Sequence, residues 1–298
     1  MNSYVTTPTQ PQSAKTTSDP AANPYAVKLV DSVSELAVLP HVVFKVLDIS
    51  GSTDNPADEL EKAIIIDPAF STKLLAHANS SFYSLARKVT SIRDALVYLG
   101  FKEVRQMAMT IGVFDMFVGK NDKNSLRRRA WWRESLDTAI ACRYIAESSG
   151  HIDPSEAYTC GLLHCIGKTL LDRFGEADYA AVEQRIAVGS SEKDAEKRVY
   201  GCDHEMVAVL AGKKWGLSSQ LIASFEYSDE LEKSHSYPQY RACVAMGTMI
   251  AKLAIVGARD IDLLPFWAAD ELGFSHESIP ALYDHAVEHI AASGGMSF

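Results

Sequence analysis

Apolar residues along most of the chain recur every three or four positions, which is the spacing of one face of an α-helix. Leu39, Val42, Val43 and Val46 follow this spacing, and the stretch 132–146 repeats it. Alternating runs typical of strands are nearly absent, and convincing Asn-Gly or Asp-Gly hairpins between such runs are missing. The pattern therefore predicts an all-α fold of about twelve to fourteen helices with short connections marked by Gly or Pro.

Two Asp-Pro pairs carry the start signal of a helix. Asp67 precedes Pro68, and Asp153 precedes Pro154 with Glu156 at the capping-box position. The aspartate can accept hydrogen bonds from the free amides of the first turn, and proline has no amide to leave unpaired there. Each pair therefore predicts a helix that begins at its proline.

Composition and polar breaks divide the chain into segments. The leader 1–30 opens with a run rich in Thr, Ser, Pro, Gln and Ala, which cannot bury enough apolar area to offset its conformational entropy. We therefore expect it to be disordered. A polar break at 119–125 separates two helical blocks, 31–118 and 122–226. Residues 227–298 are expected to form a helical extension that packs on the second block.

The bulk composition narrows the classes of protein that this chain can represent. Its 298 residues are 47% hydrophobic, and 38 acidic against 29 basic residues give a net charge of −9. That balance provides no general attraction to nucleic acid or to an anionic membrane. No segment approaches the roughly 18 apolar residues of a membrane span, and no secretory signal is visible at the start. We expect a cytoplasmic protein that binds neither nucleic acid nor membrane.

The chain has five cysteines, all in apolar stretches with helical spacing. They are Cys142, Cys160, Cys165, Cys202 and Cys243. An odd number placed in this way favours reduced and buried thiols over a disulfide framework.

Several motifs occur in an order that is similar to one known family. They are LP (39–40), IIIDPAFSTKLLAHANSSFY (64–83), SIRDALVYLGFKEVRQMAM (91–109), WWRESLDTA (131–139), GLLHCIGKTLL (161–171) and YGCDHEMVAVLAGKKWGL (200–217). Residues 31–226 resemble the bacterial HDOD domain family. The resemblance implies an all-α, multi-helix fold with an N-terminal helical block and a C-terminal block similar to HD-type phosphohydrolases. It also implies a signalling module that is mostly non-catalytic.

The resemblance also points to the positions of a metal site. A working HD site is a cage of histidines and aspartates that holds divalent ions and activates water. The corresponding relic positions here are Glu134, His164, Cys165, His204 and Thr248. Two histidines without an aspartate are too few for an open catalytic site, and a thiolate is a poor ligand for hard ions such as Mg²⁺. We expect a degenerate site with no catalytic residue, no metal and no cofactor.

Two alternatives for this site stay open. The first is a phosphohydrolase that acts on a nucleotide or cyclic dinucleotide through a divalent metal at His164 and His204. The second is a structural zinc site, for which Cys165 and Cys202 would join the two histidines. Against the zinc site, residues 164 and 165 point about 100° apart if they are neighbours on a helix.

Residues next to His164 offer a third hypothesis. Lys168 lies one helical turn further on and is a candidate phosphate or ligand contact, so the old pocket could act as a small-ligand sensor without turnover. Gly161 and Gly167 flank the histidine, and we interpret them as positions of tight helix packing.

The segment LRRRAWWRES (126–135) combines arginines with two tryptophans. We expect Trp132 to join the core and Arg127, Arg128 and Arg129 to form a solvated face that could dock an acidic protein partner. The favoured function is therefore non-enzymatic signal transduction through a regulatory protein partner, at this face or at the groove between the blocks. The sequence leaves the partner and the oligomeric state open.

Overall fold

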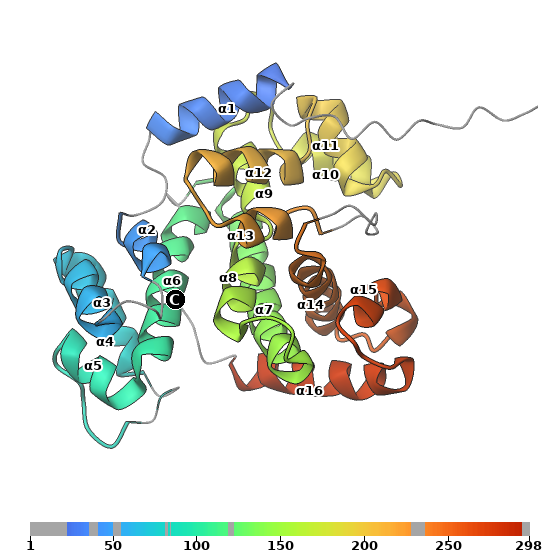
Figure 1. Cartoon of the computed structure of the whole chain (residues 1–298). Helices are drawn as coiled ribbons and strands as arrows, with labels where there is room; N and C mark the ends of the chain where they lie inside the picture. Colours follow the sequence, from blue (N-terminus) through green and yellow to red (C-terminus); the bar gives the residue numbers. More distant parts are fainter. Residues whose placement is uncertain are drawn as a thin grey trace, which may run out of the picture.

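The computed structural model describes residues 23–35, 41–49, 55–80, 83, 85–118, 122–227 and 236–293. Every regular element in these ranges is a helix, which confirms the all-α prediction (Figure 1). No helix in this part of the chain combines the length and apolar character needed to cross a bilayer.

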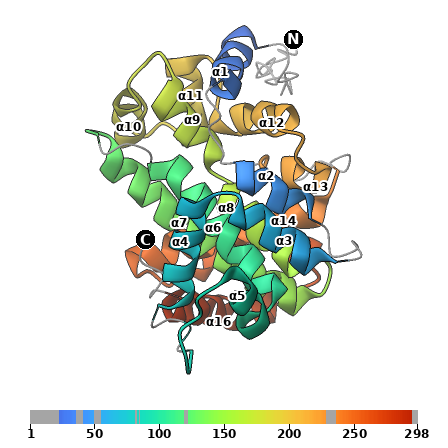
Figure 2. The ribbon, with the colours of Figure 1, turned by 90° about the vertical axis from the view of Figure 1, so that its left-hand side faces the viewer.

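The first block is built around one long helix. Its elements are α2 (His41–Asp48), α3 (Pro56–Ile65), α4 (Pro68–Ala78), α5 (Ile92–Leu99) and α6 (Phe101–Val118). The shorter helices pack on α6, whose buried side chains follow each other along most of its length. Figure 2 views the molecule from the side of this block.

The first helix of the chain belongs to the other block in space. Helix α1 (Pro24–Glu35) packs on α12 (His204–Lys214) and α9 (Ile166–Phe174) (Figure 1). The expectation of a disordered leader over 1–30 is therefore wrong for residues 24–30, which are helical. Their apolar positions Ala26, Leu29 and Val30 are buried, and this packing stabilises the helix. Residues 1–22 lie outside the described residues.

The second block contains the longest helix of the described chain, α7 (Ser125–Ser149). Its other elements are α8 (Pro154–Leu163), α9, α10 (Ala180–Ala187), α11 (Glu192–Tyr200), α12 and α13 (Ser219–Ser224). Helix α8 runs close along α7. A Cβ on Gly161 would lie 2.7 Å from the Cα of Ala139, so the helices can approach this closely only because residue 161 is a glycine. The packing interpretation of this glycine is confirmed.

The C-terminal helices also lie against α7. They are α14 (Pro238–Val256), a short turn at Ile261–Leu263, α15 (Phe266–Glu271), a second turn at His276–Ser278, and α16 (Ile279–Ala292). Helices α14 and α16 both pack on α7, and a Cβ on Gly247 of α14 would lie 2.6 Å from the sulfur of Cys142. Helix α7 is thus covered by α6, α8, α14 and α16.

The helix starts predicted from the Asp-Pro pairs are confirmed. Asp67 accepts a hydrogen bond from the amide of Phe70 at 3.0 Å, and α4 begins at Pro68. Asp153 accepts from the amides of Ser155 and Glu156 at 2.9 and 3.0 Å, and α8 begins at Pro154.

The two blocks share one core. Trp132 of α7 is buried, as expected, and its ring meets Phe114 and Phe117 of α6 edge-on at centroid distances of 5.3 and 5.8 Å. All five cysteines are buried and free of disulfides, as the sequence predicted. The contacts of Trp132 with Phe114 and Phe117 join the apolar side chains of α6 and α7 into one continuous core.

Candidate functional site

The segment GLLHCIGKTLL contains a helix break at its centre. Helix α8 ends at Leu163, and α9 begins at Ile166, so that His164 and Cys165 form the turn between them. His164 is fully buried, and its Nδ1 lies 2.7 Å from the carbonyl oxygen of Gly161. The sulfur of Cys165 lies 2.9 Å from the hydroxyl of Ser135 and is directed toward the backbone of α7. The two neighbouring side chains therefore point toward different parts of the protein, His164 toward Gly161 and Cys165 toward Ser135.

Glu134 of α7 reaches the free side of the His164 ring. Its Oε1 lies 3.8 Å from Nε2 of His164 and 3.6 Å from Nζ of Lys252 on α14. Burial opposes the charge of Glu134, but His164, Lys168 and Lys252 together hold the pKa of this carboxyl well below its usual range. Burial lowers the pKa of His164, although Glu134 opposes this. Nδ1 donates to the Gly161 carbonyl, because a carbonyl oxygen can only accept.

Lys168 of α9 brings a cation into the interior. Its side chain is 2% exposed, and Nζ lies 2.8 Å from Oε2 of Glu192 on α11. Burial opposes the ammonium, but the carboxylates of Glu192 and Glu134 keep the pKa of Lys168 well above its ordinary value. Lys168 in turn helps lower the pKa of Glu192 to about 2 against the effect of burial. The lysine is therefore a charged, paired group inside the protein.

His204 begins α12 and is held by a second buried carboxylate. Its Nδ1 and its backbone amide lie 2.6 and 2.9 Å from Oε2 of Glu196 on α11. The other oxygen of Glu196 accepts the hydroxyl of Tyr179 at 2.5 Å. Burial works against protonation of His204, but Glu196 raises its pKa above the ordinary value. The carboxylate fixes the orientation of this ring.

A group of buried polar atoms at these positions has no hydrogen-bond partner among the described residues. They are Oε1 of Glu134, Nε2 of His164, Nε2 of His204 and Oγ1 of Thr248. All four belong to positions that the resemblance singled out. Both histidines use Nδ1 for an outer hydrogen bond and leave Nε2 free, which is how metal-binding histidines are usually oriented. We call Glu134, His164, Lys168, Glu192, His204 and Thr248 the His164 cluster.

The comparison with protein families decides the membership of the chain. The model of the HDOD domain matches residues 36–231, which is well over half of the sequence. The chain belongs to the HDOD family.

Solved structures of similar fold include other HDOD-type proteins. An HDOD domain protein of unknown function from Geobacter sulfurreducens is 25% identical, with a TM-score of 0.72 over 90% of this chain and 96% of its own. A protein from Shewanella amazonensis SB2B, named as a candidate phosphohydrolase, is 23% identical, with a TM-score of 0.69 over 93% of this chain and 99% of its own. A candidate signal transduction protein from Marinobacter aquaeolei VT8 has a TM-score of 0.70 at 18% identity, over 92% of this chain and 67% of its own.

The curated relatives are longer than this chain. An uncharacterized protein of Treponema pallidum (strain Nichols) is 19% identical over 74% of this chain and 42% of its own length. The protein YuxH of Bacillus subtilis (strain 168) is 24% identical over 58% of this chain and 40% of its own length. The HDOD chain thus spans less than half of the length of these relatives.

The residues of this HDOD protein do not fit the divalent metal of an HD site. Lys168 and Lys252 place two ammonium groups beside Glu134, where they repel a cation and neutralise the carboxylate. The sulfur of Cys165 faces Ser135 on α7. Within the described ranges, no three side chains of His, Cys, Asp or Glu are arranged to hold a metal.

The surroundings of the two cysteines bear on the zinc alternative. Burial raises the pKa of both Cys165 and Cys202 to about 12, so both thiols are protonated at neutral pH. Zinc binds the thiolate rather than the thiol. A bound zinc ion would itself release these protons, but the sulfur of Cys165 is directed at Ser135 and the backbone of α7.

Gly167 explains why Lys168 and His204 lie in one cluster. A Cβ at position 167 would lie 1.9 Å from the carbonyl oxygen of His204, so α9 packs directly on the first residue of α12. The packing interpretation of this glycine is confirmed as well. Several members of the surroundings escaped the sequence analysis, namely Glu192, Glu196, Tyr227 and Lys252. The spacing of Glu192 and Glu196, one turn apart on a helix, was the available signal for two of them.

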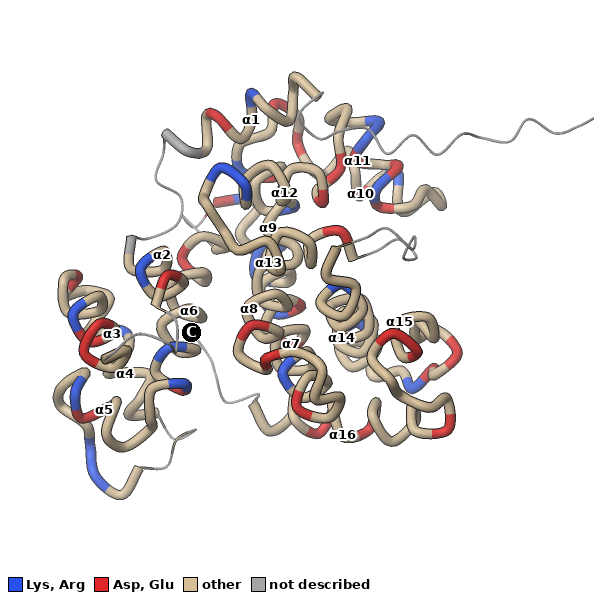
Figure 3. The backbone as a smooth tube through the Cα atoms, viewed as in Figure 1, with Lys and Arg blue, Asp and Glu red and all other residues tan. Residues whose placement is uncertain are grey.

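The expected solvated face of arginines is wrong for two of its three members. Arg128 is 2% exposed and donates to Asp172 and Asp122 at 2.9 and 2.7 Å. Arg127 donates to Asp172 at 2.7 Å and to both oxygens of Glu183 at 2.8 Å. These side chains hold α7 against α9 and α10. Arg129 is exposed, and Figure 3 shows basic and acidic residues interspersed along the helices.

Proposed function

We propose that this HDOD protein is a non-catalytic signal-transduction module that acts through a regulatory protein partner, with a degenerate metal site. The observation that carries the proposal is the buried ammonium of Lys168, paired with Glu192 at 2.8 Å. Positive charge at the His164 cluster comes from the chain itself. A cluster that is already neutralised in this way has little to offer a second cation.

The partner half of the proposal rests on apolar side chains that the fold leaves exposed. Ile66 at the end of α3 is 63% exposed, and Val97 on the neighbouring helix α5 is 72% exposed. Ile65 and Tyr98 beside them are exposed too. Exposed apolar groups on adjacent helices are typical of protein-binding surfaces. The solved relative named as a candidate signal transduction protein fits the same role.

Metal content tests the degenerate site. The full chain would be purified without a histidine tag, incubated with Mn²⁺, Fe²⁺ or Zn²⁺, desalted and measured by mass spectrometry. We expect no stoichiometric metal. One Mn or Fe per chain that is lost in His164→Ala but kept in His151→Ala would overturn the proposal and favour a phosphohydrolase acting on phosphodiesters. Zinc that is lost in Cys165→Ser would indicate the structural site instead.

Partner binding is tested by a matched pair of surface variants. A protein that crosslinks to the full chain in its native cells should no longer crosslink to the Val97→Glu variant, because a charge would disrupt an apolar interface. It should be retained with Val188→Glu, which changes a residue that is 83% exposed on the other block. Equal capture by both variants would contradict a partner surface on α3 and α5.

A further inference from the structure

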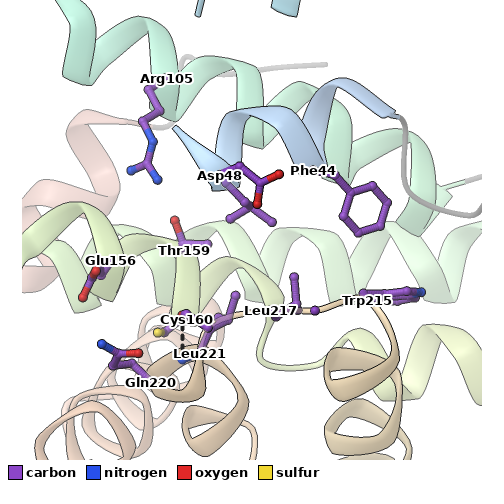
Figure 4. Close-up of a pocket in the computed structure, with 13 residues that line it drawn as sticks. Phe44, Asp48, Arg105, Glu156, Thr159, Cys160, Trp215, Leu217, Gln220 and Leu221 are labelled. Carbon is purple, nitrogen blue, oxygen red and sulfur yellow. Dashed lines mark hydrogen bonds between the residues drawn. The ribbon is translucent and has the colours of Figure 1, made fainter. Parts of the chain in front are cut away.

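A groove between the two blocks has the properties of a ligand site. Its cavity measures about 240 Å³ and is lined by α2 and α6 of the first block, and by α8, α13 and the loop before α13 of the second (Figure 4). A cavity of about 150 Å³ is enough to hold benzene. The groove therefore accommodates a small molecule with one ring or a branched chain and a polar head.

One end of the groove is apolar. Phe44 of α2 and Trp215, just after α12, meet edge-on at a centroid distance of 6.4 Å. Leu47, Leu217 and Leu221 continue this wall, and Figure 4 shows the two aromatic rings at the same end. An apolar side chain placed here would leave water for a surface that is already formed.

Arg105 of α6 brings an incompletely paired cation to the other end. Its Nε donates to the carbonyl oxygen of Val46 at 3.2 Å. Its two terminal nitrogens have no acceptor within the part of the chain that the structure describes, and Figure 4 shows the guanidinium directed into the groove. Burial lowers the pKa of Arg105, although Asp153 and Glu156 partly offset this. A guanidinium in this position gains from an anion that pairs with its free edge.

Asp48 brings an unpaired carboxylate to the same groove. It lies at the last residue of α2, is exposed, and takes part in no hydrogen bond or ion pair with any described residue, Arg105 included. The other acid of the lining, Glu156, already accepts the hydroxyl of Tyr240. Opposite charges that line one cavity without pairing are complementary to a molecule that carries both charges.

We propose that the groove between the blocks binds a free α-amino acid with an apolar side chain. Its carboxylate pairs with Arg105, its ammonium with Asp48, and its side chain lies against Phe44, Leu217 and Trp215. The ligand would touch both blocks and so stabilise their packing on each other. This site is separate from the His164 cluster and does not depend on the protein partner proposed above.

Calorimetry and thermal unfolding of the full chain test this site with L-leucine and L-phenylalanine as probes. We expect saturable binding and a higher Tm at concentrations up to about 10 mM. Phenylalaninamide, which lacks the carboxylate, and N-acetylphenylalanine, which lacks the ammonium, should bind about tenfold more weakly or not at all. Equal binding of either derivative would overturn the zwitterion assignment, and no binding of any apolar amino acid would overturn the site.

Variants locate the binding in the groove. Arg105→Gln and Asp48→Asn should each weaken the binding of L-phenylalanine by about tenfold or more. Lys102→Gln, an exposed change on the same helix as Arg105, should leave the affinity unchanged. Circular dichroism verifies the fold of each variant, and Asp48→Asn changes only an exposed side chain, so it remains informative if Arg105→Gln unfolds. Unchanged affinity in a folded Asp48→Asn protein would overturn the proposed contact.

Discussion

Two clusters of buried charge in the second block differ in how completely their polar atoms are paired. Around Asp172, whose side chain is 0% exposed, Arg127 and Arg128 find carboxylate partners for each guanidinium. In the His164 cluster, four buried polar atoms lack a hydrogen-bond partner among the described residues. Because buried polar groups are normally satisfied, the first arrangement is a structural element, whereas the unpaired atoms of the second are what the proposed degenerate site rests on.

The largest effect is expected where the pairing is complete. Asp172→Ala would leave two largely buried guanidinium groups without their shared carboxylate. We expect the free energy of unfolding to fall by about 3–5 kcal/mol, as when one member of a buried ion pair is removed. Denaturant unfolding measures this loss. Glu183→Ala, whose side chain is 50% exposed, should cost about 1 kcal/mol or less. Equal losses for the two variants would contradict a distinct role for Asp172.

An intermediate effect is expected in the acid range. The folded protein holds the pKa of Glu192 at about 2, below its ordinary value of 4.5. The unfolded state therefore takes up a proton first, and the stability contributed by Glu192 is present above pH 4.5 and lost as the pH falls toward about 2. Glu192→Gln should flatten this part of the stability profile.

Lys168→Met should flatten the same limb, because the lysine is the largest of the charges that lower the pKa of Glu192. Unfolding by urea at a series of pH values measures both profiles. An unaltered acid limb in Lys168→Met would show that the ammonium does not stabilise this carboxylate in solution.

The smallest effect is expected at the unpaired atoms themselves. Thr248→Val removes a buried hydroxyl that has no hydrogen-bond partner in the described part of the chain, so the change in stability should be near zero or stabilising by about 0.5 kcal/mol. Thr110→Val is the matched control, because the Thr110 hydroxyl lies 2.8 Å from the hydroxyl of Tyr158. That variant should lose about 1 kcal/mol. A larger loss for Thr248→Val than for Thr110→Val would indicate that Thr248 is hydrogen-bonded in solution.

The fold was largely predictable because its signals are local. Helical spacing and the Asp-Pro pairs at 67–68 and 153–154 depend on residues within one or two turns, and both predictions are confirmed. The expected disorder of residues 24–30 was wrong because their burial comes from a distant element, α12. Composition alone carries no information about such contacts.

The site was predictable only in part, for a related physical reason. Motif order singled out Glu134, His164 and His204, but not Glu192 and Glu196, which pair with Lys168 and His204. Lys168 meets Glu192 from another helix, and the arginine pair meets Asp172 more than forty residues away in the sequence. The tertiary fold determines which partners a long side chain can reach. A helical face whose sequence predicts exposure to solvent can therefore be buried.

Gly167 has a consequence for how such a protein can change over time. Any side chain larger than hydrogen at this position would force α9 away from the carbonyl of His204. Selection for a stable core is therefore sufficient to keep Lys168 and His204 together, whether or not the pocket serves any chemistry. Helix packing can therefore preserve the shape of a pocket even when the side chains that line it change.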